Sequence, residues 1–266
     1  ANESNRKMIE KLRAAGVRPE DEGSPALADR SLAGLRFVVT GRLEQFSRSE
    51  IEEKIKQKKL SAEAKEKVEK ELKKHTNVKL VTAIHAETST GIKQPVEELS
   101  RLAKEHNAIF MVDAVTSLGG VPVEVDGWEI DAIYSGSQKC LSCPPGMSPV
   151  SFSQRAMQRI SNRKSKVQSW YLDVSMLASY WGSDRIYHHT APINMTYGLY
   201  EAVRLILEEG LEACFQRHMR NHEALKAGLS AMEISYSTQP PHQLPMLNAV
   251  CVPPGVDDGR LRKNLL

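Results

Sequence analysis

An alternation of strand, helix and strand that begins at residue 78 constrains this sequence most. The apolar run Val78–Ile84 predicts a buried strand, and residues 95–106 have the spacing of an amphipathic helix. The run Ala108–Asp113 predicts a second buried strand, which ends in an acid. Strands that alternate with helices at this spacing predict a parallel sheet wrapped by helices. The expected fold class is therefore α/β.

Further elements extend this pattern towards the C-terminus. We expect strands over residues 131–135, 148–152 and 247–252, and long helices over residues 195–209 and 211–229. The sequence shows no internal repeat.

The composition changes near residue 78 and divides the chain into three pieces. Residues 1–50 combine a helix over Arg6–Ala15, a Pro/Gly/Ser-rich connection and a strand over Arg36–Thr40. Residues 51–77 are a lysine and glutamate run with opposite charges three and four apart, which is typical of an exposed helical linker. Residues 78–266 carry the strand and helix pattern. We therefore expect an α/β domain with a helical N-terminal appendage.

Charge and composition exclude several function classes. The 266 residues include 36 Lys and Arg against 33 Asp and Glu, and this net charge of +3 is too small to predict a nucleic-acid or membrane partner. No apolar run approaches the roughly 20 residues that span a bilayer. Residues 1–12 lack the apolar core of a secretory signal. The four irregularly spaced cysteines indicate a reducing compartment, and we expect a cytoplasmic protein.

Polar residues follow three of the expected strands. They are Glu87–Gly91 after the strand ending at Ile84, Asp113 at the end of its own strand, and Ser135–Lys139 after the strand that begins at Asp131. Ligands of open α/β sheets bind beyond the carboxyl ends of the strands. A lysine amine can hold an aldehyde cofactor as an imine, and a carboxylate can keep a pyridine nitrogen protonated. From the residues alone, however, an acid such as Asp113 at a strand end is more commonly a helix cap or turn former. A lone lysine such as Lys139 is usually a solvated surface charge.

Two other motifs carry weaker signals. Cys140-Leu-Ser-Cys143 has the spacing of a redox pair or of half a zinc site, but no second such pair follows it, and we expect no metal site. His188 and His189 are expected to be loop or interface residues.

Several separate motifs, in order over about two thirds of the chain, carry a family resemblance. They are His85-Ala-Glu-Thr-Ser-Thr-Gly91, Val112-Asp-Ala-Val-Thr-Ser-Leu-Gly-Gly120, Tyr134-Ser-Gly-Ser-Gln-Lys-Cys-Leu141, Pro144-Pro-Gly146, Pro149-Val-Ser-Phe152, Tyr187-His-His-Thr190 and Glu209-Gly-Leu211. Residues 78–266 thus resemble the large domain of class V, fold-type I aminotransferases of the alanine–glyoxylate and serine–pyruvate group. The resemblance implies a three-layer, mostly parallel sheet and the cofactor pyridoxal 5′-phosphate.

The resemblance also implies a role for each residue at the strand ends. Lys139 matches the lysine that forms the Schiff base and shuttles a proton to the cofactor. Asp113 matches the acid beside the pyridine nitrogen, and Val115 the residue under the ring. Thr88 matches a hydroxyl that hydrogen-bonds the cofactor, and Gln138 the residue beside its phosphate.

A subunit arrangement and a reaction follow from the same resemblance. Tyr187 and Thr190 match a pair that reaches the cofactor phosphate from the neighbouring subunit, which implies a homodimer. The implied function is transamination between a small amino acid, alanine or serine, and a 2-oxo acid, glyoxylate or pyruvate, through a Schiff base on Lys139. The resemblance also allows a peroxisomal location, although Asn264-Leu-Leu266 is not the usual C-terminal signal.

The sequence departs from this family at both ends. Residues 1–77 contain no Trp, so the aromatic ring that stacks on the pyridine has no match there. Arg260 and Arg262 do not match the arginine that binds the substrate carboxylate. We therefore expect a family domain that is truncated at both ends.

The first piece has a resemblance of its own. Leu32–Gly41 and Arg48–Ile55 are similar to the first strand and helix of a BRCT domain, as in bacterial NAD-dependent DNA ligases. The chain then reads as a mosaic of fragments. The alternative function is a BRCT-type interaction module, within residues 1–55, joined to a catalytically inactive aminotransferase fragment.

Overall fold

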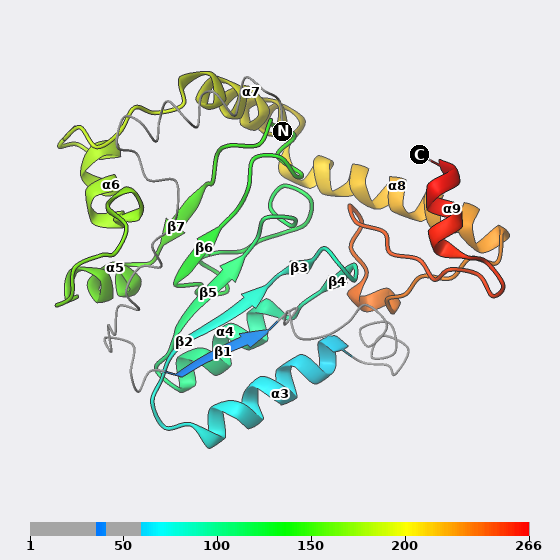
Figure 1. Cartoon of the computed structure of the whole chain (residues 1–266), viewed down its shortest axis with the longest axis horizontal. Helices are drawn as coiled ribbons and strands as arrows, with labels where there is room; N and C mark the ends of the chain where they lie inside the picture. The colour runs from blue at the N-terminus through cyan, green and yellow to red at the C-terminus, as the bar shows by residue number, and fades with distance from the viewer. Residues whose placement is uncertain (1–35, 41–59, 266) are drawn as a thin grey trace, which may run out of the picture. The chain divides into compact units, whose positions relative to one another are not determined.

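The computed structural model describes residues 36–40 and 60–265 of the chain. In this part of the chain, one sheet has the strand order β1-β2-β5-β6-β7 (Figure 1). Its strands are β1 (Arg36–Thr40), β2 (Val78–Ile84), β5 (Ile109–Asp113), β6 (Ala132–Tyr134) and β7 (Val150–Phe152). Neighbouring strands from β1 to β6 are parallel, whereas β7 is antiparallel to β6. The α/β class with a mostly parallel sheet is confirmed.

Side-chain alternation separates the two faces of this sheet. On one face, Val81 and Ala83 of β2 and Phe110 and Val112 of β5 are fully buried, and all four belong to the hydrophobic core. Helices α3 (Leu60–Lys74) and α4 (Val96–Glu105) contact the strands of this sheet and supply the other side of that core. Asp113 follows Val112 directly, so its side chain points to the other face of the sheet, and it is only half-buried. The carboxylate therefore lies away from this core.

Helix α3 differs from the expected solvated linker. Its Val68 and Leu72 are 2% and 1% exposed, and both pack in the same core as β2 and β5. Its charged residues form exposed pairs, such as Glu69 with Lys73 at 2.6 Å. The helix is therefore amphipathic, because two apolar positions four residues apart share its inward face.

The start of the sheet also differs from the expected boundary at residue 78. Strand β1 lies inside the segment that resembles a BRCT domain, yet it pairs in parallel with β2 over the full length of β1. The compact unit that contains the sheet begins at Leu35. The rest of residues 1–55, including the predicted helix over Arg6–Ala15 and the segment Arg48–Ile55, lies outside the described residues.

The remaining elements are mostly helical. They are the hairpin of β3 (Ala86–Glu87) and β4 (Ile92–Lys93), helices α5 (Gln154–Ser161), α6 (Val174–Trp181), α7 (Ile193–Glu209), α8 (Leu211–Ala231) and α9 (Asp258–Leu265), and the short 3₁₀ turns η2 (Trp170–Leu172) and η3 (Pro240–His242). The two long helices predicted after residue 195 are confirmed. Gly210 separates them with a φ of +87°, a conformation that favours glycine.

One predicted strand does not form. Residues 247–252 make only isolated bridges, Leu244 with Leu247 and Tyr236 with Val250. The adjacent Pro253 and Pro254 have no N–H to continue a ladder. Within residues 36–40 and 60–265, no helix combines the length and the apolar character that a bilayer crossing requires.

Candidate active site

The strand pairing brings the expected polar residues to one edge of the sheet. Ile84 pairs with Asp113, and Asp113 pairs with Tyr134, so β2, β5 and β6 end at the same level. The segments that follow these strands carry Thr88, Val115 and Lys139. All of them therefore start from one sheet edge, which is where ligands of α/β sheets bind.

The carboxylate of Asp113 is held by two donors. Its Oδ1 accepts from the backbone N–H of Val115 at 2.9 Å, and its Oδ2 accepts from the hydroxyl of Tyr134 at 2.8 Å. Burial, and then the hydrogen bond to the Asp113 carboxylate and its charge, raise the pKa of Tyr134 to about 12. The phenol is therefore protonated at neutral pH and remains a donor. Each carboxylate oxygen retains a lone pair for a further donor.

Tyr134 was not among the residues predicted for the site. In the structure, the last residue of β6 pairs with Asp113. The sequence alone does not give this strand register, so it could not point to Tyr134. The direct contact between the two side chains identifies Tyr134 as part of the site's framework.

Gly136 brings the β5 and β6 segments close together. A Cβ at this position would lie 2.7 Å from Oε1 of Gln138 and 3.3 Å from Cγ1 of Val115. Val115 and Gln138 therefore approach the same stretch of backbone, from two different strand ends. Any side chain larger than hydrogen at residue 136 would displace one of them.

A hydroxyl pair joins the β2 and β5 segments. Oγ1 of Thr88 lies 2.9 Å from Oγ1 of Thr116. Thr88 is exposed and Thr116 is buried, so the buried residue holds the exposed one at the edge. The turn before β4 is fixed by Glu87, whose Oε1 accepts from the N–H and hydroxyl of Ser89.

Lys139 is exposed and lies in a loop, residues 137–147, that internal hydrogen bonds hold in place. Ser137 is fully buried, and its hydroxyl donates to the carbonyl of Pro144 at 2.7 Å and accepts from the N–H of Met147 at 3.3 Å. The carbonyl of Lys139 accepts from the N–H of Ser142 at 2.9 Å. These bonds fix the backbone on both sides of the lysine and leave its amine at the surface.

Tyr187 and Thr190 lie apart from the strand-end residues along the chain, between α6 and α7. The two hydroxyls are 3.1 Å apart, both side chains are exposed, and no hydrogen bond in the described part of the chain joins them to the strand ends. The neighbouring His188 is buried, stacks on Trp170 at 4.2 Å between ring centroids, and contacts the Trp170 carbonyl. The tyrosine and threonine are thus presented outward from a packed aromatic turn.

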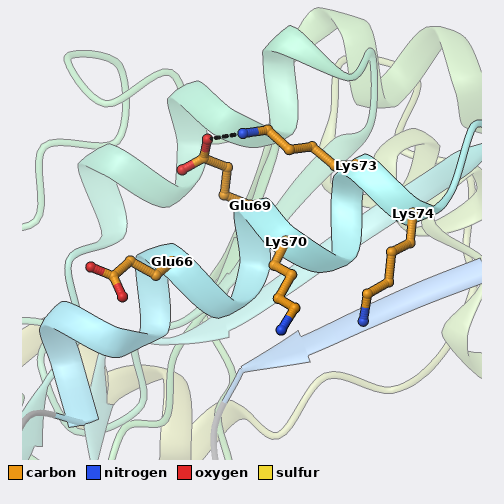
Figure 2. Close-up of a pocket in the computed structure, with 5 residues that line it drawn as sticks. All are labelled: Glu66, Glu69, Lys70, Lys73 and Lys74. Atoms are coloured by element: carbon orange, nitrogen blue, oxygen red, sulfur yellow. Dashed lines mark hydrogen bonds and ion pairs between the residues drawn. The ribbon is translucent and has the colours of Figure 1, made fainter.

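A hollow on α3 has a different character. Figure 2 shows its lining, which consists of Glu66, Glu69, Lys70, Lys73 and Lys74. The carboxylate of Glu69 and the amine of Lys73 neutralise each other across one helical turn. None of the strand-end residues lines this hollow, so we place the candidate site at the sheet edge. Among residues 36–40 and 60–265, no cluster of three metal-ligating side chains is present.

The residues at the sheet edge fit pyridoxal 5′-phosphate by their chemistry. Lys139 offers an accessible amine, Asp113 an oriented carboxylate, and Thr88 an exposed hydroxyl. At Gly136, the side chains of Val115 and Gln138 approach the backbone so closely that a Cβ would meet both of them. An amine, a carboxylate and a hydroxyl are the groups that an aldehyde-bearing pyridine phosphate requires.

Comparison with known proteins gives a consistent result. The family model described as aminotransferase class V matches residues 37–258, a span that includes most of β1 and all of α3. An (S)-ureidoglycine–glyoxylate transaminase of Bacillus subtilis is 38% identical over 219 residues, which are 76% of this chain and 52% of the relative. An alanine–glyoxylate aminotransferase of Mus musculus is 39% identical over 194 residues, 71% of this chain and 47% of the relative.

Solved structures of aminotransferases have a similar fold. The alanine–glyoxylate aminotransferase of a Nostoc species superposes with a TM-score of 0.73 at 46% identity, over 76% of this chain and 53% of that one. The pyridoxamine–pyruvate aminotransferase of Mesorhizobium loti has a TM-score of 0.68 at 30% identity, over 75% of this chain and 51% of that one. The present chain spans about half the length of the relatives that it matches.

Proposed function

We propose, because this chain belongs to the class-V aminotransferase family, that its sheet edge binds pyridoxal 5′-phosphate and carries out transamination. The single observation that supports this most is the arrangement at the ends of β5 and β6. An oriented acid, Asp113, pairs directly with Tyr134, and Lys139 follows five residues later in the loop of residues 137–147. Acid and amine thereby come from adjacent parallel strands.

The bound cofactor would supply an aldehyde that an amine can take up and a ring that draws electrons from the substrate α-carbon. Lys139 provides that amine, and afterwards moves a proton between the substrate α-carbon and the cofactor. Asp113 holds a proton on the pyridine nitrogen. Tyr134 and the N–H of Val115 fix the carboxylate for this task, one on each oxygen.

The other strand-end residues position the cofactor. Thr88 hydrogen-bonds it through a hydroxyl that Thr116 holds in place. Val115 packs under the ring, and Gln138 lies beside the phosphate. Val115 and Gln138 both approach the position that a Cβ at Gly136 would take, which supports placing them on the same cofactor.

The substrates we propose are a small amino acid, alanine or serine, and glyoxylate or pyruvate as the 2-oxo acid. The names of the similar proteins support the acceptor in particular, since they include glyoxylate and pyruvate. A homodimer would bring Tyr187 and Thr190 to the cofactor phosphate of the partner subunit. The exposure of large apolar side chains in the same region, including Trp170, Trp181 and Ile193, supports such an interface.

A cofactor titration tests this function. Pyridoxal 5′-phosphate added to the purified chain should produce a visible absorbance band that saturates and that Lys139→Ala lacks. Lys164→Ala, which removes an exposed lysine of the segment after α5, is the matched control and should keep the band. A chain without any such band would instead favour the interaction-module alternative, whose residues lie mostly outside the described part. A cytoplasmic location stays a prediction.

A further inference from the structure

The sulfurs of the Cys140-Leu-Ser-Cys143 motif have different neighbours. The thiol of Cys140 donates to the carbonyl of Thr116 at 3.3 Å, and it lies 2.7 Å from the position that a Cβ at Gly120 would take. The thiol of Cys143 lies instead 3.5 Å from the corresponding position at Gly198, in α7. The motif that looks like a redox pair in the sequence is therefore divided between two environments.

A cysteine from a distant part of the chain approaches Cys140. Cys214 of α8 is buried, and its thiol donates to the carbonyl of Gly119 at 3.3 Å. Gly119 and Gly120 are consecutive residues of one turn, so the two thiols lie against the same short stretch of backbone. Burial chiefly, and then the nearby Cys214 thiolate, raise the pKa of Cys140 to about 11, while the charge of Lys139 opposes this.

We propose that Cys140 and Cys214 are an oxidation-sensitive pair, which a peroxide converts into an intramolecular disulfide between α8 and the loop that carries Lys139. The Cys140 thiol donates to the carbonyl of Thr116 and the Cys214 thiol donates to the carbonyl of Gly119, so both sulfurs lie against the turn of residues 116–120. A sulfur–sulfur bond of about 2.05 Å requires both thiols to leave those carbonyls.

The oxidation proceeds in two balanced steps. Cys140 is the more accessible of the two thiols. The small fraction of it that is deprotonated at pH 8.5 attacks hydrogen peroxide and forms a sulfenic acid and hydroxide, and the hydroxide takes up the proton that left the thiol to give one water. Deprotonated Cys214 then attacks the Cys140 sulfur and forms the disulfide, and the hydroxide that leaves takes up the Cys214 proton to give a second water. Two thiols and one peroxide thus give one disulfide and two waters. Burial raises the pKa of Cys214, and the guanidinium of Arg217, which contacts the Cys214 sulfur at 3.2 Å, opposes this shift in part.

The disulfide would act directly on the proposed cofactor lysine. Cys140 is the covalent neighbour of Lys139, so drawing its sulfur towards α8 shifts the backbone from which the amine extends. This consequence rests on the function proposed above, whereas the formation of the disulfide does not.

Peptide mapping of the oxidised full chain tests the pairing. The protein is treated with hydrogen peroxide at pH 8.5, its remaining thiols are alkylated under denaturing conditions, and it is digested with trypsin. Cys140 and Cys143 share the tryptic peptide of residues 140–155, and Cys214 lies in the peptide of residues 205–217. We expect these two peptides to be linked, with fragmentation showing alkylated Cys143. A link within residues 140–155, or alkylated Cys140 and Cys214, would overturn the proposal.

Variants separate the pair from the other cysteines. Cys143→Ala should keep the link between the two peptides, and Cys251→Ser, at the exposed cysteine, should remove only links between molecules. Cys214→Ser should leave Cys140 as a sulfenic acid that dimedone captures. Loss of the link in Cys143→Ala, or no dimedone adduct on Cys140 in Cys214→Ser, contradicts the assignment. The mapping of the unmodified chain stands even if a variant fails to fold.

The consequence for Lys139 has its own readout. Oxidised protein should lose most of the pyridoxal 5′-phosphate that borohydride traps on Lys139, and dithiothreitol should restore it. Equal trapping before and after oxidation would overturn the control of the lysine by the disulfide. Failure of the reduced protein to trap cofactor would contradict the proposed function instead, and the peptide map would still decide the pairing.

Discussion

Buried His85 should make the stability of this chain depend on pH below neutrality. The residue follows β2, donates its backbone N–H to the carbonyl of Asp113 at 2.9 Å, and is 2% exposed. Burial, and to a lesser extent the charge of Lys93, lower the pKa of its imidazole to about 4 from the ordinary 6.5. Its ring packs edge-on against Trp128 at 5.5 Å, and its Nδ1 has no hydrogen-bond partner.

The sign and size of the effect follow from these values. The folded state holds a neutral imidazole, whereas the unfolded state takes up a proton below pH 6.5. The contribution to stability is therefore complete above pH 6.5 and is lost as the pH falls towards 4. A difference of about 2.5 pKa units corresponds to about 3 kcal/mol of unfolding free energy.

Urea unfolding at pH 7.0, 5.5 and 4.5 measures this loss. His85→Phe keeps an aromatic ring beside Trp128 and removes the titrating group, so its unfolding free energy should fall less steeply with acid. The substitution also changes packing and therefore the absolute stability. For this reason, the change of unfolding free energy with pH is compared between the two proteins, and not the free energy at one pH. His106→Gln, at the C-terminal end of α4, controls for the loss of a histidine. Parallel slopes for the unmodified chain and His85→Phe would refute the reasoning.

Two further predictions concern the core and the acid. Leu72→Ala should lower the unfolding free energy by about 2–5 kcal/mol in urea titrations, because α3 packs in the core, while Lys70→Ala should cost less than about 0.5 kcal/mol; equal effects would return α3 to a solvated linker. Asp113→Asn should weaken binding of pyridoxal 5′-phosphate about 10- to 100-fold in spectroscopic titrations, since a charge-assisted hydrogen bond is worth roughly 1.5–3 kcal/mol. Exposed Asp126→Asn should leave it unchanged, and unchanged binding in Asp113→Asn would remove the acid from the site.

The sequence predicted the centre of the sheet well, and the reason is physical. Apolar runs such as Val78–Ile84 and Ala108–Asp113 are buried strands, and their pattern needs no tertiary information. The rule that parallel strands present their carboxyl ends together was sufficient to group Asp113 with the segment that ends at Lys139.

The periphery was harder to predict. In α3, dense charge conceals an inward face of only a few apolar residues, among them Val68 and Leu72, so the pattern favoured a solvated helix. Strand β1 was assigned to a different family because its run of three apolar residues, Phe37-Val-Val39, fits many folds. The approach of Cys214 to the turn beside Cys140 joins residues 74 positions apart, and periodicity carries no signal for such a contact.

The identity of the trapped lysine tests the central claim most directly. The chain is incubated with pyridoxal 5′-phosphate, reduced with borohydride and digested with trypsin. Reduction onto Lys139 blocks cleavage there, so the cofactor mass should appear on one peptide that spans residues 105–155. Lys139→Ala should yield no labelled peptide. Label on another lysine, such as Lys164 or Lys166, would contradict the assignment of the site to the edge formed by β2, β5 and β6.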